Sequence, residues 1–340
     1  MVMNVQKLET LPPPPGVIGS LRAGFDSVSS HVKLILLPLA LDLWLWLGPR
    51  LSVDGLLSPY LKFLFEQARR GLAAPADIQR FASAQSSFME VLERFNLLSL
   101  LGKLVTFPIG VSSLLAGTMP VATPYGAQQV VQISSLPGLV GLVFLFVLIG
   151  WVGGGLYFRW VSETALGKEE AGVSSVWAII QTFILSVIWL IGLMMLMVPV
   201  LLVLTVLALI SPALANGAVF VMLMLSFWVI VPLFFTPHGI FVRRQNAFSS
   251  VLSSLRMARF TLPTSGMFVL SAFLLYRGLN YLWSVPANDS WMLLIGIAGH
   301  AFITTALLAA SFVYYRDMNA WLQTVFEQVK HKQTIPGRQV

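Results

Sequence analysis

The chain lacks cysteine and has very little charge: none of its 340 residues is Cys, and only 10% are Asp, Glu, Lys or Arg. The absence of cysteine excludes disulfides, thiolate metal sites, iron–sulfur clusters and cysteine nucleophiles. Soluble domains carry about 25% charged residues, so the shortage of charge excludes an ordinary soluble enzyme. The four histidines, His31, His238, His300 and His331, show no metal-ligand spacing. We therefore expect no metal and no cofactor.

Long apolar runs take the place of the missing charge. Hydrophobic residues make up 57% of the chain, and residues 104–158 and 171–237 contain no charged side chain. Windows of about 20 apolar residues, the length that crosses a bilayer, predict six transmembrane helices at 32–47, 136–158, 177–210, 213–235, 266–283 and 291–315. The third is too long for a straight crossing, and Pro199 predicts a kink in it. The Ser211-Pro212 step predicts a tight hairpin to the fourth.

The distribution of basic residues predicts the orientation. The net charge is +7, from 21 Lys and Arg against 14 Asp and Glu. These basic residues flank the apolar runs, which is a topology pattern, so we do not expect nucleic-acid binding. With the N-terminus inside, thirteen basic residues lie in short cytoplasmic segments and only Arg277 in a short external one. We therefore expect a multi-pass protein of the cell membrane, of the bacterial cytoplasmic type, with both termini in the cytoplasm and the first span retained.

Residues 48–135 are the least membrane-like part and are expected to form an external helical loop or cap. Two amphipathic helices are predicted, one on Leu56, Tyr60, Leu61 and Leu64, the other from Ile78 to Phe95 with Asp77 as its cap. A Pro- and Gly-rich return follows. Residues 97–119 are apolar enough for a seventh span, but Lys103, Pro108 and Gly110 interrupt them. A re-entrant or interfacial piece is the preferred interpretation.

A threefold repeat is visible across the chain. Ser20-Leu21-Arg22 and Ser254-Leu255-Arg256 each precede an outward span, and three inward spans end in Tyr157-Phe158-Arg159, Phe241-Val242-Arg243 and Tyr314-Tyr315-Arg316. The predicted unit is an interfacial helix followed by a span out and a span back. Residues 1–31 and 245–260 supply the first and third interfacial helices, whereas the middle one, near 168–176, matches weakly. Residues 136–315 then form a five-helix region, and 316–340 an amphipathic cytoplasmic tail.

A few polar groups inside the predicted spans are candidates for function. Asp42 and Arg277 lie at similar depth in two outward spans, so we predict that they pair, joined by His300 or Asn280. The alternative is that each extends independently to the outer interface. Gly150, Gly153, Gly154 and Gly155 are expected to allow close helix packing.

Residues 246–321 combine a short helix ending at Arg259 and Pro263 with two spans that close on Tyr314-Tyr315-Arg316. This pattern resembles uncharacterised bacterial polytopic membrane proteins, including the membrane domain attached to some glycerophosphoryl diester phosphodiesterases. No phosphodiesterase catalytic domain follows, so the resemblance implies an all-α membrane helix bundle and transfers no catalytic residue.

The sequence predicts a non-enzymatic membrane protein with a scaffolding, accessory or bilayer-organising role. A transporter or lipid-handling permease is the alternative, favoured by the repeat and by the polar residues within spans. Membrane lipids are the expected partners, and a protein partner or a second copy of the chain stays open. No nucleophile, base and orienting group can be assembled from spacing, so no catalytic residue is predicted.

Overall fold

The computed structural model describes residues 13–71, 74–102 and 107–334 of the chain. The outer ends of both predicted cytoplasmic segments and residues 103–106 of the candidate seventh span lie outside the described residues. The chain divides into two compact units. Unit 1 comprises residues 1–31, 158–276 and 305–340, and unit 2 comprises residues 32–157 and 277–304.

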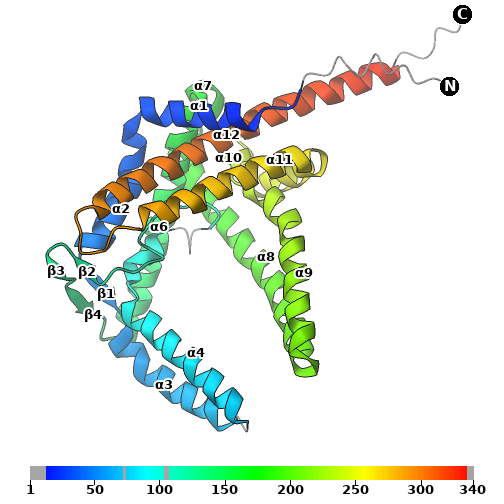
Figure 1. The fold of residues 1–340 in the computed structure, drawn as a ribbon. Helices are drawn as coiled ribbons and strands as arrows, with labels where there is room; N and C mark the ends of the chain where they lie inside the picture. Colours follow the sequence, from blue (N-terminus) through cyan, green and yellow to red (C-terminus); the bar gives the residue numbers. More distant parts are fainter. Residues whose placement is uncertain (1–12, 72–73, 103–106, 335–340) are drawn as a thin grey trace, which may run out of the picture. The chain divides into compact units, whose positions relative to one another are not determined.

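Helices dominate the described residues, as the sequence predicts (Figure 1). In chain order they are α1 (Val17–Ser30), η2 (Val32–Ile35), α2 (Leu36–Leu47), α3 (Asp54–Arg70), α4 (Pro75–Arg94), η3 (Leu97–Leu101), α6 (Leu136–Leu166), α7 (Lys168–Ala171), α8 (Ser175–Ile210), α9 (Pro212–Phe234), α10 (His238–Arg243), α11 (Ala247–Trp283) and α12 (Leu293–Thr334). Short strands β1 (Arg50–Ser52) and β4 (Val130–Gln132) pair in parallel, and β2 (Ala122–Thr123) pairs with β3 (Gly126–Ala127) antiparallel.

Five of the described helices are long and apolar enough to cross a membrane, and a sixth crossing is formed if the bent pair α1 and 32–47 counts as one. The helix is broken at His31, between these two segments. Thr261 has non-helical backbone angles within α11, so a break also separates 247–260 from the following span. α8 runs through Pro199 as one 36-residue helix.

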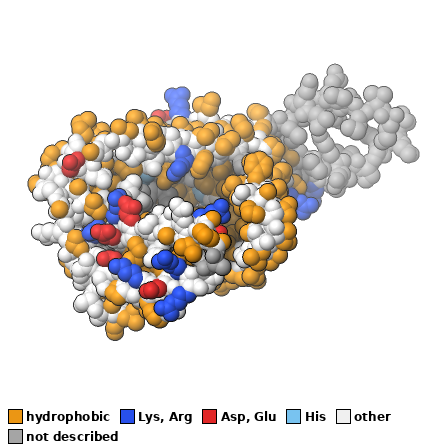
Figure 2. All heavy atoms as spheres, turned by 60° about the horizontal axis from the view of Figure 1, so that its bottom comes forward, with side chains coloured by type: hydrophobic (Ala, Val, Ile, Leu, Met, Phe, Trp, Pro, Cys, Tyr) orange, Lys and Arg blue, Asp and Glu red, His pale blue; other side chains and the backbone are white. Residues whose placement is uncertain are grey.

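Unit 2 has a core in which the loop 48–135 packs on residues of the predicted spans. Leu45 and Trp46 of α2 contact buried residues of the loop, among them Leu97 and Leu115, and Ile297 of α12. The predicted amphipathic helices of the loop are confirmed as α3 and α4, whose rings Phe65 and Phe88 meet edge to face. Acidic and basic side chains are interspersed on the face shown in Figure 2.

Two details of the loop differ from expectation. Asp77 is not the cap of α4, because the helix begins at Pro75, Ala74 holds the cap position, and no side chain bonds there. In the candidate seventh span, the described residues form the short helix η3 and then irregular backbone with buried Ile109, Val111 and Leu115. A seventh helical crossing is therefore absent from the described part of 97–119, because Pro108 and Gly110 interrupt the helix that its apolar composition would allow.

The aromatic ends of the three inward spans meet in unit 1. Ring centroids of Phe158 and Phe241 are 5.8 Å apart, and those of Phe312 lie 6.0 and 6.1 Å from them. Tyr157, Tyr314 and Tyr315 are also buried. All of them except Tyr157, which belongs to unit 2, lie in the buried interior of unit 1. An interfacial position and a packed core both favour aromatic residues at the end of a span, so composition does not separate them.

α1 and the first part of α11, the two helices predicted to be interfacial, pack through small residues. The buried residues of α1 are Ser20, Gly24 and Val28, and Ser250, Ser254 and Ala258 occupy the same face of α11. The apolar stripe of α11, with Phe248, Leu252 and Leu255, is exposed instead. The repeated Ser-Leu-Arg motif thus places its serine toward protein. In the third copy, leucine and arginine are turned outward.

Contacts within unit 1 follow a cyclic order. Gly24 of α1 lies against the backbone of Ala306 and Ala310 in α12. Ser250 and Ser254 of α11 donate to the Thr236 and Pro232 carbonyls at the end of α9. Arg159, near the end of α6, donates to the carbonyl of Val173 at 2.6 Å. Three contacts thus follow one another around unit 1: residues near Val173 contact α6, the start of α11 contacts the end of α9, and α1 contacts α12.

The predicted tail from residue 316 is not a separate element, because α12 continues to Thr334 as one 42-residue helix. Met318 and Leu322 on this continuation belong to the hydrophobic core of unit 1. The apolar stripe in this part of the sequence thus packs at its beginning on the protein itself, and the periodicity alone does not distinguish this from packing on a membrane.

Candidate functional site

The one acidic residue in the predicted spans, Asp42, is fully buried in unit 2. The buried residues of α2 are Pro38, Asp42, Leu45 and Trp46, which share one helix face because they follow at intervals of three and four. Asp42 therefore points into the protein, where a carboxyl group needs hydrogen-bond donors to offset its loss of water.

Three donors from the irregular segment after Pro108 meet this carboxyl group. The Ser113 hydroxyl and the backbone N–H of Leu115, at 3.1 Å, donate to one oxygen, and the Leu114 N–H donates to the other at 2.9 Å. The Ser113 oxygen also accepts from Ala116 N–H at 2.9 Å. Asp42 thus satisfies backbone groups that no helix or sheet would satisfy inside a membrane protein.

A second set of buried contacts holds the end of α2. The Gln128 amide nitrogen donates to the carbonyls of Leu45 at 2.9 Å and Gly48 at 2.8 Å. The indole N–H of Trp46 donates to the Asn288 carbonyl at 2.7 Å. Because these carbonyls close the helix, Gln128 plays the part of a side-chain cap. These hydrogen bonds join α2 to two stretches of the loop 48–135, one around Ser113 and one at Gln128.

The predicted pair between Asp42 and Arg277 is not formed. Ion pairs between described residues do not join these two side chains, and the Arg277 side chain is exposed. His300 is buried in α12, and its carbonyl accepts from Thr304. Asn280 is half-buried in α11, and no described contact links it to Asp42. The carboxyl group of Asp42 therefore has backbone donors from Leu114 and Leu115 where the sequence predicted the cation of Arg277.

Sequence reasoning missed Ser113 and Gln128. The available clue was that a carboxyl group in an apolar helix needs donors, and that Ser112-Ser113 lies in an interrupted, glycine-containing segment. The described residues contain no group of three or more His, Asp or Glu side chains that could hold a metal ion.

The glycine-rich part of α6 meets the same irregular segment. A Cβ added at Gly154 would lie 3.0 Å from the Gly110 Cα and the Ile109 carbonyl oxygen, whereas one at Gly153 would meet nothing within 4 Å. The close packing predicted from these glycines is present at Gly154, and its partner here is irregular backbone where another helix was expected.

We expect Gly154→Ala to destabilise the protein by about 1 to 3 kcal/mol, the usual cost of overpacking. Gly153→Ala is the matched control and should leave stability unchanged or raise it slightly, because Ala favours the helix. Thermal unfolding of both variants in mild detergent measures the difference. Equal effects would show that residues 109–110 do not approach α6 closely.

Comparisons of this chain with protein-family models, with curated proteins and with solved structures find no match.

Proposed function

We propose that this multi-pass membrane protein is non-enzymatic and organises the lipid bilayer around it, in a scaffolding or accessory role. The observation that supports the proposal is the α8–α9 hairpin of unit 1. Its helices lie side by side (Figure 1), and the sequence from 171 to 237 carries no charge.

Between Leu190 of α8 and Ile230 of α9, the described residues of the hairpin are exposed on all sides except the seam between the two helices. Along α8, Val200, Leu204 and Leu207 are half-buried, and along α9 Ala215, Ala218 and Met222 are half-buried, which marks the faces that the helices turn to each other. None of the most apolar 18-residue window of α8 is buried, against 61% of that window in α12. Such an apolar surface needs an apolar environment, and acyl chains supply it.

The length of α8 suits a tilted crossing. Its 36 residues rise about 54 Å at 1.5 Å per residue, which is more than the roughly 40–45 Å of a bilayer with its headgroups, so the helix spans both headgroup regions when it is tilted. Leu190 to Ile210 is the part that turns an apolar surface outward. A paired, charge-free hairpin of this length would order acyl chains along nearly its whole circumference. The proposal places 48–135 outside, both termini in the cytoplasm and the protein in the bacterial cytoplasmic membrane, and it keeps the resemblance to phosphodiesterase membrane domains.

Site-directed spin labelling tests the proposal cleanly because the chain has no native cysteine. In reconstituted vesicles we expect labels at Leu201 and Val203, which lie outside the seam, to be accessible to oxygen dissolved in the lipid. The seam position Leu204 is the matched control and should be protected. Spin-labelled lipids in the same vesicles should show a motionally restricted population that scales with protein.

Protection at Leu201 or Val203 would indicate that protein covers the hairpin and would contradict a lipid-facing role. The second candidate function, a transporter or lipid-handling permease, is favoured by one observation, the irregular buried segment held by Asp42, since broken backbone within membranes commonly lines binding sites. Protein-dependent flux of solute or lipid in these vesicles would favour the permease.

A further inference from the structure

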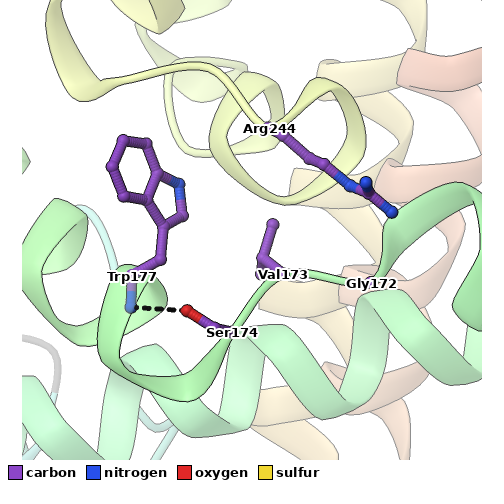
Figure 3. Close-up of a pocket in the computed structure, with 5 residues that line it drawn as sticks. All are labelled: Gly172, Val173, Ser174, Trp177 and Arg244. Atoms are coloured by element: carbon purple, nitrogen blue, oxygen red, sulfur yellow. Dashed lines mark hydrogen bonds between the residues drawn. The ribbon is translucent and has the colours of Figure 1, made fainter.

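A surface pocket of about 350 Å³ lies in unit 1, where α7 ends and α8 begins. Gly172, Val173, Ser174, Trp177 and Arg244 line it. Figure 3 shows the indole of Trp177 and the side chain of Arg244 on either side of Val173. The pocket thus combines a cationic group and an aromatic ring, and its volume is within the range of small-molecule sites, about 300 to 1,000 Å³.

The wall of the pocket is held by hydrogen bonds. Arg159 of α6 donates to the Val173 carbonyl and to the Ser175 hydroxyl, both at 2.6 Å, and pairs with Glu163 at 2.8 Å. The Ser174 hydroxyl accepts a hydrogen bond from the backbone N–H of Trp177 at 3.2 Å. The charge of Arg159 is therefore balanced by Glu163, and these contacts fix the backbone on which Trp177 is mounted.

Arg244 is the cation of the pocket. It ends α10 in the left-handed conformation, with φ of 53°, where glycine is usual. Its side chain is exposed, and the ion pairs found among described residues do not include it. The guanidinium group lies next to Gly172, so it is held at the pocket.

The pocket also lies where the chain enters the membrane. The charged residues Lys168, Glu169 and Glu170 precede it, and the charge-free sequence of α8 follows. Tryptophan is typical of this boundary, and arginine binds phosphate through a planar fork of donors. Lipid headgroups carry their phosphate at this depth.

We infer that this pocket binds the phosphate group of an anionic phospholipid, with Arg244 donating to the phosphate and Trp177 lying along the glycerol and upper acyl chain. The inference deepens the proposed bilayer role by naming the lipid class. Lipid retention tests the pocket, and the spin labels on the hairpin test the proposed bilayer role. The two proposals can therefore fail independently of each other.

The test measures retention of phosphatidylglycerol against phosphatidylcholine by native mass spectrometry of the whole chain in mild detergent. We expect preferential retention of phosphatidylglycerol by the wild type and about tenfold weaker retention by Arg244→Gly, as expected for loss of a charge-assisted contact. Glycine suits the left-handed backbone at position 244, so this variant should keep its thermal stability. Arg244→Lys should recover part of the binding.

Arg256→Gln is the matched control, because Arg256 is an exposed cation of unit 1 outside the pocket, and it should retain phosphatidylglycerol as the wild type does. Equal loss in the two variants, or unchanged retention in Arg244→Gly, would overturn the inference. The second arm of the test adds inorganic phosphate at about 10 mM. This concentration is far below the dissociation constant expected for a free anion held by a single arginine contact, so no binding is expected. Binding of phosphate to lipid-free protein, lost in Arg244→Gly, would assign the pocket to a soluble anion and overturn the lipid assignment.

Discussion

Asp42→Ala is expected to lower the free energy of unfolding by about 3 to 5 kcal/mol, the largest effect of any single substitution considered for this chain. The reason is that alanine leaves the Ser113 hydroxyl and the N–H groups of Leu114 and Leu115 buried without an acceptor. Asp42→Asn should cost less, since one of its side-chain oxygens still accepts. Unfolding in mixed detergent micelles measures the loss.

Arg277→Gln provides the control and should change stability by less than about 0.5 kcal/mol, as exposed substitutions usually do. The double variant Asp42→Ala with Arg277→Gln should be additive, because no ion pair joins these residues. A coupling of more than about 1 kcal/mol in that cycle would mean that the two side chains interact after all.

Gly24→Ala is expected to have the second largest effect. An added Cβ would overlap the backbone nitrogen of Ala310 and the carbonyl oxygen of Ala306, and backbone cannot move aside as a flexible side chain can. We expect a loss of about 1 to 3 kcal/mol or release of α1 from α12. Limited proteolysis near residue 31 and thermal unfolding would report these two outcomes.

Gly19→Ala is a control within the same helix, since nothing lies within 4 Å of a Cβ at that position. It should stabilise by up to about 1 kcal/mol because alanine is the better helix former. The two substitutions in this helix should thus change the free energy of unfolding in opposite directions. A change in the same direction would argue against close packing of α1 on α12.

The spans were accessible from sequence because the bilayer imposes a fixed length and an apolar composition. Residues 177–210 and 213–235 were expected as spans, and α8 and α9 lie at Ser175–Ile210 and Pro212–Phe234. The break before the fifth span was accessible too, since Pro263 follows Arg259 closely and Thr261 interrupts the helix. These features depend on local residues.

The contacts of Asp42 depend on residues distant in the chain. A carboxyl group in an apolar helix shows that a partner is needed, but backbone N–H groups exist at every residue and leave no mark in the sequence. Depth along the helix favoured Arg277 as the partner of Asp42, whereas in the structure Ser113, Leu114 and Leu115 donate to its carboxyl group. The packed face of α1 was equally hard to predict, because it is formed by the small residues Ser20 and Gly24 and not by the larger apolar side chains of the helix.

The cyclic packing in unit 1 has a consequence for synthesis of the protein. α1 leaves the ribosome well before its support, the part of α12 around Ala306 and Ala310. The other two segments of the ring find their supports already made, since α6 precedes Val173 and α9 precedes Ser250. α1 therefore has no partner in the ring until Ala310 has been translated, and the ring closes only after the spans between them have been made.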